Sequence, residues 1–245
     1  MHVKNFTSSE EFVRESADFI LSCATGIAVK KIALSGGSTP IPVYAECAKR
    51  GKEILQTVEF FQVDERYVPQ GDVNSNFNLI IQSGLPPLAR AFHHFDTSIS
   101  IAESLRKYEI ELPEYFDLVV LGIGEDGHIA SLFPHDPALH EKIRLVAHTT
   151  TDVFAVKDRL TITLPLILSS KKILVLLKGA EKKKVLDEIL YVGRRELQQN
   201  SEHSEREGEA PVRLCRPEGA TRAPIKALPA KALLGHNDVT VHFLM

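Results

Sequence analysis

The segment that most constrains the fold of this chain is residues 116–134, FDLVVLGIGEDGHIASLFP. It begins with a continuous apolar run bounded by turn residues, which is typical of a strand buried on both faces of a parallel sheet. The run leads into three glycines, which permit backbone conformations and close approaches that other residues resist. In an open α/β sheet, ligands bind beyond the carboxyl ends of the strands. The segment therefore predicts a parallel sheet and a ligand site at its edge.

His128 is the side chain of this segment best suited to proton transfer, because an imidazole ordinarily titrates near neutral pH. Glu125 and Asp126 precede it, and Gly124 stands before them. Taken alone, the segment is equally compatible with a tight turn whose histidine only packs. The choice between a proton-transfer role and a packing role for His128 depends on the other motifs of the chain.

A second Gly-rich segment, SGGSTP at residues 35–40, lies between a predicted strand at residues 31–34 and a predicted helix at residues 41–51. We expect Ser38 or Thr39 to cap this helix and Pro40 to occupy its first turn. The free amides and the helix dipole at such a place make it a natural phosphate site. The segment matches neither a Walker loop nor the GxGxxG fingerprint. On its own it could also be an ordinary tight turn.

Two further predicted strands are followed by charged residues. The strand at residues 58–63 precedes DERYVP, which contains Asp64 and Arg66, and the strand at residues 171–178 precedes a helix with Lys182 in its first turn. A cation is unfavourable at a helix N-terminus, and an anionic ligand would relieve this. Both sets of charges could instead form a solvated surface.

Strands alternate with helices along the chain, which predicts a three-layer α/β/α fold with a mostly parallel, Rossmann-like sheet. We expect a single domain over residues 1–245. In such a sheet the four polar strand ends lie on one edge. They would form a pocket for a phosphorylated small molecule with one proton-transfer group. Residues 193–222 are rich in Glu, Arg, Gln, Ser and Gly, and we expect a polar, mobile surface insert there.

Composition excludes several classes of protein. With a net charge of −3 and no nucleic-acid motif, the chain gives no indication of a DNA or RNA partner. The three cysteines are scattered and form no CxxC pair, so the sequence predicts neither a disulfide framework nor a zinc site. Reduced thiols fit a cytoplasmic compartment. The sequence has no signal-peptide core and no apolar run of transmembrane length, so we expect no membrane association.

Together the motifs resemble the 6-phosphogluconolactonase family, within the broader group that includes glucosamine-6-phosphate deaminases. The matching segments are residues 35–40 (SGGSTP), 64–69 (DERYVP), 74–76 (NSN), 121–134, 159–165 (RLTITLP) and 179–182 (GAEK). The resemblance covers nearly the whole chain except about residues 193–222. It implies the sugar-phosphate isomerase/lactonase type of Rossmann-like fold, a phosphorylated sugar lactone as substrate, and no cofactor or metal.

Two positions separate lactonases from deaminases in this comparison. The deaminase pattern HIAFNEP contains a glutamate that works with the histidine in ring opening, whereas Phe133 stands at that place here and cannot transfer a proton. Deaminases have a tyrosine where this chain has Arg66, which fits a lactonase. Ile129 and the C-terminal segment at residues 228–241 are more deaminase-like.

The resemblance therefore favours hydrolysis of 6-phospho-D-glucono-1,5-lactone to 6-phosphogluconate, a reaction of the oxidative pentose phosphate pathway. A glucosamine-6-phosphate deaminase/isomerase is one alternative, and a non-catalytic sugar-phosphate-binding protein is another. The oligomeric state stays open.

The resemblance also implies roles for individual residues. His128 is expected to act as the general base that activates water, and Asp126 or Glu125 either orients its ring or only shapes the turn. Arg159 is matched by position alone and could equally form a structural ion pair. The expected substrate-binding residues are Gly36, Gly37, Ser38, Thr39, Asp64, Arg66, Gly124, Lys182 and Arg159.

Overall fold

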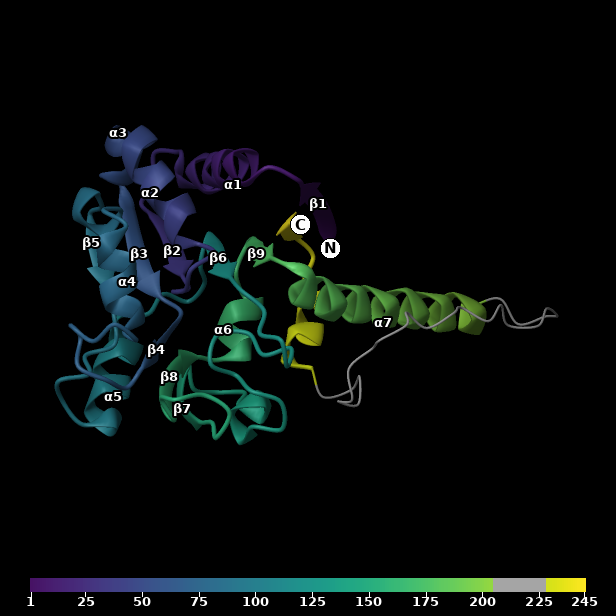
Figure 1. The fold of residues 1–245 in the computed structure, drawn as a ribbon. Coiled ribbons are helices and arrows are strands. Elements are labelled where there is room, and N and C mark those ends of the chain that lie inside the picture. The colour runs from purple at the N-terminus through teal and green to yellow at the C-terminus, as the bar shows by residue number, and fades with distance from the viewer. Residues whose placement is uncertain (205–227) are drawn as a thin grey trace.

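A computed structural model describes residues 1–204 and 228–245, and it describes residues 192 and 194–204 by their backbone only. Figure 1 shows the arrangement of the elements. In chain order they are β1 (His2–Phe6), α1 (Ser9–Ala24), β2 (Lys30–Leu34), α2 (Ile41–Arg50), α3 (Lys52–Leu55), β3 (Val58–Gln62), β4 (Asp64–Arg66), α4 (Asn76–Gln82), η1 (Pro86–Leu88), β5 (Ala91–His93), α5 (Ile101–Glu111), β6 (Leu118–Leu121), η2 (Pro137–His140), β7 (Val146–Thr150), β8 (Asp158–Ile162), α6 (Leu164–Leu168), β9 (Ile173–Lys178), α7 (Ala180–Ser204), η4 (Pro229–Gly235) and β10 (Val239–Leu244).

The centre of the fold is a seven-stranded parallel sheet with the strand order β1-β10-β9-β6-β2-β3-β5. Successive residues of a strand face opposite sides of the sheet, so the apolar residues of β9 contribute alternately to two hydrophobic cores. Ile173 and Val175 pack in the core that includes residues of α6 and α7, and Leu174 and Leu176 pack in the core under α1 and α2. Helices therefore cover both faces of the sheet (Figure 1), and the predicted three-layer, mostly parallel α/β fold is confirmed.

A second, three-stranded antiparallel sheet with the order β4-β8-β7 was not predicted. Residues 64–66 form a strand of their own because they pair with residues 159–161 of β8. β8 ends at Ile162, and α6 begins at Leu164. Pro165 stands in the first turn of α6, a place that proline suits.

β1 and β5 were also not predicted from the sequence. Both lie at the edges of the large sheet. Their side chains are mostly exposed or half-buried, so neither strand has the apolar pattern of the inner strands.

The helix predicted after β9 is α7, and it continues to Ser204. Residues 193–204, where the expected polar insert begins, are thus helical, and the rest of that insert, residues 205–222, lies outside the described residues. Within the described residues, no helix is both long enough and apolar enough to cross a membrane.

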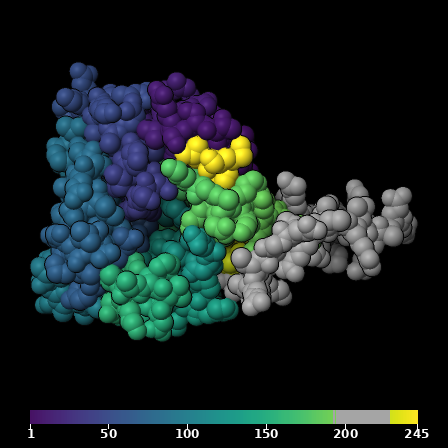
Figure 2. All heavy atoms as spheres, in the orientation of Figure 1, coloured from purple at the N-terminus to yellow at the C-terminus, as the bar shows by residue number. Residues whose placement is uncertain are grey.

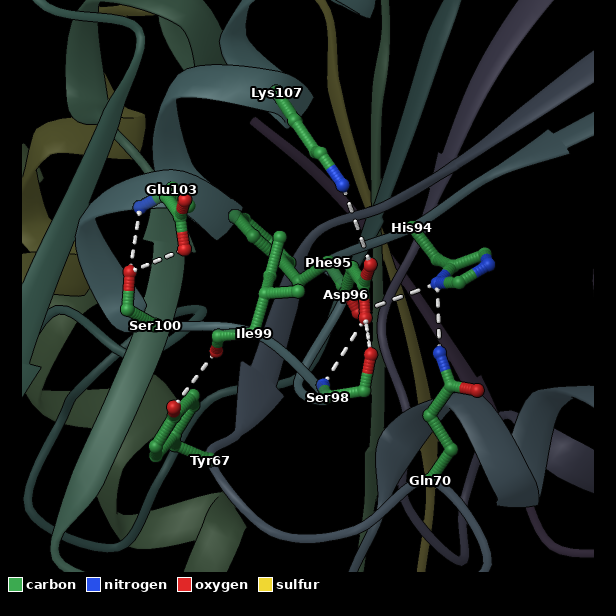
Figure 3. A network of polar contacts seen from close by, with 10 residues as sticks. All are labelled: Tyr67, Gln70, His94, Phe95, Asp96, Ser98, Ile99, Ser100, Glu103 and Lys107. Atoms are coloured by element: carbon green, nitrogen blue, oxygen red, sulfur yellow. Dashed lines mark hydrogen bonds and ion pairs between the residues drawn. The ribbon is translucent and has the colours of Figure 1, made fainter.

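Polar contacts within the connection from β5 to α5 tie it to the chain beyond β4, as Figure 3 shows. Asp96 Oδ1 accepts hydrogen bonds from the Ser98 amide at 3.0 Å and the Ser98 hydroxyl at 2.5 Å, and its other oxygen lies 3.7 Å from Lys107 Nζ. The Tyr67 hydroxyl donates to the Ile99 carbonyl at 2.8 Å. Because Tyr67 directly follows β4, this contact helps to fix the small sheet that contributes to the site.

His242 on β10 predicts a pH dependence of folding. The residue is 4% exposed, and its Nδ1 lies 2.8 Å from Ser16 Oγ of α1. Burial, and then the charge of Lys4, lower the pKa of His242 from 6.5 to about 4. The unfolded chain therefore binds this proton more readily than the folded protein. Above about pH 6.5, burial of the neutral His242 ring does not lower the free energy of unfolding. Below that pH, the free energy of unfolding falls by about 1.4 kcal/mol per pH unit towards pH 4.

Urea unfolding between pH 4 and pH 7 measures this effect. The free energy of unfolding should lose about 3 kcal/mol more in the wild type than in His242→Gln over this range. Equal losses in the two proteins would contradict the assignment.

Candidate active site

A cavity of about 460 Å³ lies where the carboxyl ends of β2, β6 and β9 meet the small antiparallel sheet. Figure 2 shows a hollow where the blue, teal and green parts of the chain adjoin. The residues that the sequence analysis assigned to a site all line this cavity: Gly36, Gly37, Ser38, Thr39, Asp64, Arg66, Gly124, Asp126, His128, Arg159 and Lys182. The structure brings them together because parallel strands end on one edge. Their individual roles stay predictions.

His128 and Asp126 form a close pair in the loop after β6. Nδ1 of His128 lies 2.5 Å from Oδ1 of Asp126, and the His128 amide donates to the same oxygen at 3.2 Å. Burial raises the pKa of Asp126, but its hydrogen bonds with His128 and the imidazole charge outweigh this, so the pKa lies below its usual value. The ionised carboxylate only accepts, so Nδ1 carries the proton of the neutral ring. Nε2 forms no hydrogen bond with the described residues and is free to accept a proton.

The imidazole lies between two phenylalanine rings. The Phe133 ring centroid is 4.9 Å from that of His128, and the Phe154 ring centroid is 5.5 Å away in an edge-to-face arrangement. Phe133 is buried, whereas Phe154 belongs to the loop between β7 and β8. Phe133 belongs to a motif that the sequence shows, whereas Phe154 was not predicted to lie at the site. Phe154 could have been noticed only as an apolar residue in a loop bounded by charged ones.

Gly124 allows the histidine and the carboxylate to lie this close to the backbone. A Cβ at Gly124 would lie 2.0 Å from His128 Nδ1 and 2.5 Å from Asp126 Oδ1. The Gly124 amide also donates to the His128 carbonyl at 2.8 Å, so the backbone cannot retreat without losing this bond.

We expect Gly124→Ala to lower kcat at least about tenfold, because the pair has to shift. Steady-state kinetics with the phosphorylated sugar lactone that the family resemblance implies, together with circular dichroism to check the fold, measure this. Gly71→Ala is the matched control, since a Cβ at Gly71 meets nothing within 4 Å. Equal kcat values for the two variants would show that turnover does not need this contact.

Three cations point to an anionic ligand. Arg66 on β4 stands directly opposite Arg159 on β8, so the two guanidinium groups are neighbours. Burial, and then the charge of Arg66, lower the pKa of Arg159 despite Asp64 and Glu65, although a guanidinium stays protonated. Among the described residues, neither arginine forms an ion pair, which argues against the interpretation of Arg159 as half of a structural pair.

Lys182 is the third cation, in the first turn of α7. Burial lowers its pKa, against the opposing charges of Glu125 and Asp126. Like the two arginines, it has no ion-pair partner within 4 Å in the described part of the chain. Buried or half-buried cations repel one another and lose hydration, which costs free energy. A polyanion such as a phosphate would therefore stabilise this arrangement.

The SGGSTP loop offers hydrogen-bond donors beside these cations. The predictions that Ser38 or Thr39 caps α2 and that Pro40 lies in its first turn are wrong, because Pro40 occupies the cap position and no side chain caps the helix. Neither hydroxyl forms a hydrogen bond with the described residues, so both can bind a ligand. Gly37 has φ = +112°, which favours glycine, and a Cβ at Gly36 would lie 2.0 Å from Asn76 Oδ1. The two glycines thus let the loop pack closely against α4 at the wall of the cavity.

Asp64 connects three segments of the cavity wall. Its Oδ2 accepts from the Ser131 hydroxyl at 2.6 Å, and its Oδ1 accepts from the Asn76 amide group at 3.2 Å. Neither Ser131 nor Asn76 was assigned to the site from the sequence, although both line the cavity. With both oxygens engaged, Asp64 fixes the wall, and its predicted contact with the substrate stays a prediction.

Comparisons with known proteins show the family of this chain. The family model described as glucosamine-6-phosphate isomerases/6-phosphogluconolactonase matches residues 7–222. A Dictyostelium discoideum protein named "Probable 6-phosphogluconolactonase" is 37% identical over 196 residues, which are 74% of this chain and 83% of that protein. The 6-phosphogluconolactonase of Thermotoga maritima is 38% identical over 165 residues, 65% of this chain and 74% of its own.

The crystal structure of the 6-phosphogluconolactonase from Thermotoga maritima superposes with a TM-score of 0.76 at 28% identity and covers 99% of this chain and 98% of its own. The chain therefore belongs to the glucosamine-6-phosphate isomerase/6-phosphogluconolactonase family.

Proposed function

We propose that this protein hydrolyses 6-phospho-D-glucono-1,5-lactone to 6-phosphogluconate. The names of its relatives support this substrate. The observation that carries the proposal is a single cavity in which a His128–Asp126 pair stands with three cations that lack a carboxylate partner among the described residues. A phosphorylated lactone has the two features that these groups match, a phosphate and an electrophilic ester carbon.

His128 acts as the general base in this proposal. Nε2 takes a proton from water while the water oxygen bonds to C1 of the lactone, and the carbonyl oxygen becomes an oxyanion. The oxyanion then reforms the carbonyl as the bond between C1 and the ring oxygen breaks. The imidazolium returns the proton to that ring oxygen, which leaves as a hydroxyl. Asp126 stays ionised throughout and stabilises the imidazolium through Nδ1.

The phosphate is held by the loop of residues 35–40 with Arg66, Arg159 and Lys182. Charge-assisted hydrogen bonds from a guanidinium to a phosphate are strong and directional. Fixing the phosphate places C1 of the substrate at a constant distance from the imidazole, and such positioning is a large part of catalysis.

The deaminase alternative is disfavoured at Phe133. A deaminase of this family pattern has a glutamate there to assist ring opening, whereas Phe133 packs its ring 4.9 Å from the imidazole centroid. Among the described residues that line the cavity, the carboxylates are Asp64, Glu125 and Asp126. Asp64 and Asp126 already accept protein hydrogen bonds, which leaves Glu125 as the carboxylate without such a bond.

The test is a coupled assay with freshly generated lactone, corrected for spontaneous hydrolysis. We expect formation of 6-phosphogluconate well above the spontaneous rate. Release of ammonia from glucosamine 6-phosphate would establish the deaminase instead. Binding of 6-phosphogluconate without turnover of the lactone would identify a non-catalytic sugar-phosphate-binding protein.

A further inference from the structure

The loop between β7 and β8 carries an exposed apolar pair, Val153 and Phe154, of which Phe154 is 38% exposed. Its base is closed by polar contacts. The Thr151 amide donates to the Lys157 carbonyl at 3.1 Å, and Lys157 Nζ lies 2.9 Å from Asp152 Oδ1. The loop is thus anchored at both ends while its tip presents two large apolar side chains to the rim of the cavity.

Among the described residues, the aromatic and cation–π contacts of the Phe154 ring are all with residues that line the cavity. Its centroid lies 5.5 Å from that of His128 with an interplanar angle of 78°, and 5.8 Å from that of Phe133. Cζ of Arg159 lies 5.6 Å from the centroid of the Phe154 ring. Phe133 and Phe154 therefore form an aromatic corner around the imidazole, and the arginine holds the outer ring of that corner in place.

We propose that Phe154 is a positioning residue for His128, an inference that rests on the proposed function. The Asp126 carboxylate holds the imidazole at Nδ1 only, and rotation of the ring by half a turn would break that bond and turn Nε2 away. A ring packed edge-to-face against the imidazole restricts this rotation.

Because Phe154 is partly exposed, a positioning role can be tested without disturbing the fold. A side chain that is more than one-third exposed and lies at a loop tip adds little to the core, so its removal should leave the fold intact. Tyr115 is the matched control. It is 44% exposed and has Lys171 Nζ 4.9 Å from its ring centroid, but it does not line the cavity.

Steady-state kinetics on Phe154→Ala, Phe154→Leu, Phe154→Tyr and Tyr115→Ala test the proposal. We expect kcat to fall about tenfold in the alanine and leucine variants with KM within about threefold of wild type, because orientation rather than substrate binding is lost. Phe154→Tyr keeps the ring and should retain kcat, and Tyr115→Ala should match the wild type. A rise in KM at unchanged kcat would overturn the proposal, since it would place Phe154 in substrate binding.

A second measurement does not depend on any lactonase activity. Nitrogen-15 NMR of the His128 ring, assigned by its absence in His128→Ala, reports which nitrogen carries the proton. We expect one fixed tautomer, protonated at Nδ1, in the wild type and in Phe154→Tyr, and averaged signals in Phe154→Ala. A fixed tautomer in Phe154→Ala would overturn the positioning role. A wild type that keeps the fixed tautomer but lacks lactonase activity would overturn the proposed function alone.

Discussion

Replacing His128 with alanine is expected to lower kcat for lactone hydrolysis by about 10²- to 10⁴-fold, the usual contribution of a general base. Nε2 is the atom on which this rests, because Nδ1 is already engaged by Asp126 at 2.5 Å. The phosphate-binding groups stay in place, so binding of 6-phosphogluconate, measured by calorimetry, should change by less than about threefold. The His128 side chain lines the cavity and is about one-fifth exposed, so its removal enlarges the cavity rather than opening a void in the core, and the variant should fold normally.

His148→Ala is the control for this experiment. His148 also pairs with a carboxylate, Asp158 Oδ1 at 2.8 Å, but it does not line the active-site cavity. Its removal should leave kcat unchanged. Asp126→Asn should lower kcat as well, because a neutral amide no longer stabilises the imidazolium or selects the tautomer. Near-normal turnover in His128→Ala would rule out the general-base role.

Replacing Arg66 with alanine is expected to raise KM about 10- to 100-fold while kcat changes much less. A hydrogen bond to a charged group contributes about 1.5–3 kcal/mol, and the phosphate does not react, so the loss falls on binding. Folding should not suffer, because Arg66 faces Arg159 and its removal relieves a like-charge contact. The free energy of unfolding without ligand should therefore change by no more than about 1 kcal/mol.

Arg90→Ala provides the comparison for Arg66→Ala. Arg90 is exposed and lies 3.2 Å from Glu59 Oε1, away from the cavity. Its KM should equal that of the wild type. The KM of the wild type should rise with ionic strength, and that of Arg66→Ala should rise less, since one cation fewer attracts the substrate. An unchanged KM in Arg66→Ala would refute its assignment to the phosphate.

The large sheet and the contents of the site could be predicted because they depend on local patterns. Apolar runs such as residues 118–121 mark buried parallel strands, and the carboxyl ends of parallel strands meet on one edge. From those two facts the glycine loops, His128 and Lys182 had to lie close together.

The small antiparallel sheet could not be predicted in the same way. A three-residue strand such as β4 has no readable periodicity, and it exists only through its pairing with β8, far along the chain. That pairing is what sets Arg66 opposite Arg159. Phe154 was missed for a similar reason. Its contact with His128 joins two loops that are distant in the chain, and neither loop has a sequence pattern that indicates the contact.

The position of β10 has a consequence for biosynthesis. In the described part of the chain, β1 pairs with β10 alone, and β10 also joins β1 to β9. A ribosome adds about 5–20 residues per second, so the first strand waits on the order of tens of seconds for its neighbour. Until then, α1 also lacks the buried contact between Ser16 and His242. We therefore expect nascent chains arrested before Val239 to be cleaved readily by proteases at the N-terminal segment and released chains to resist cleavage there.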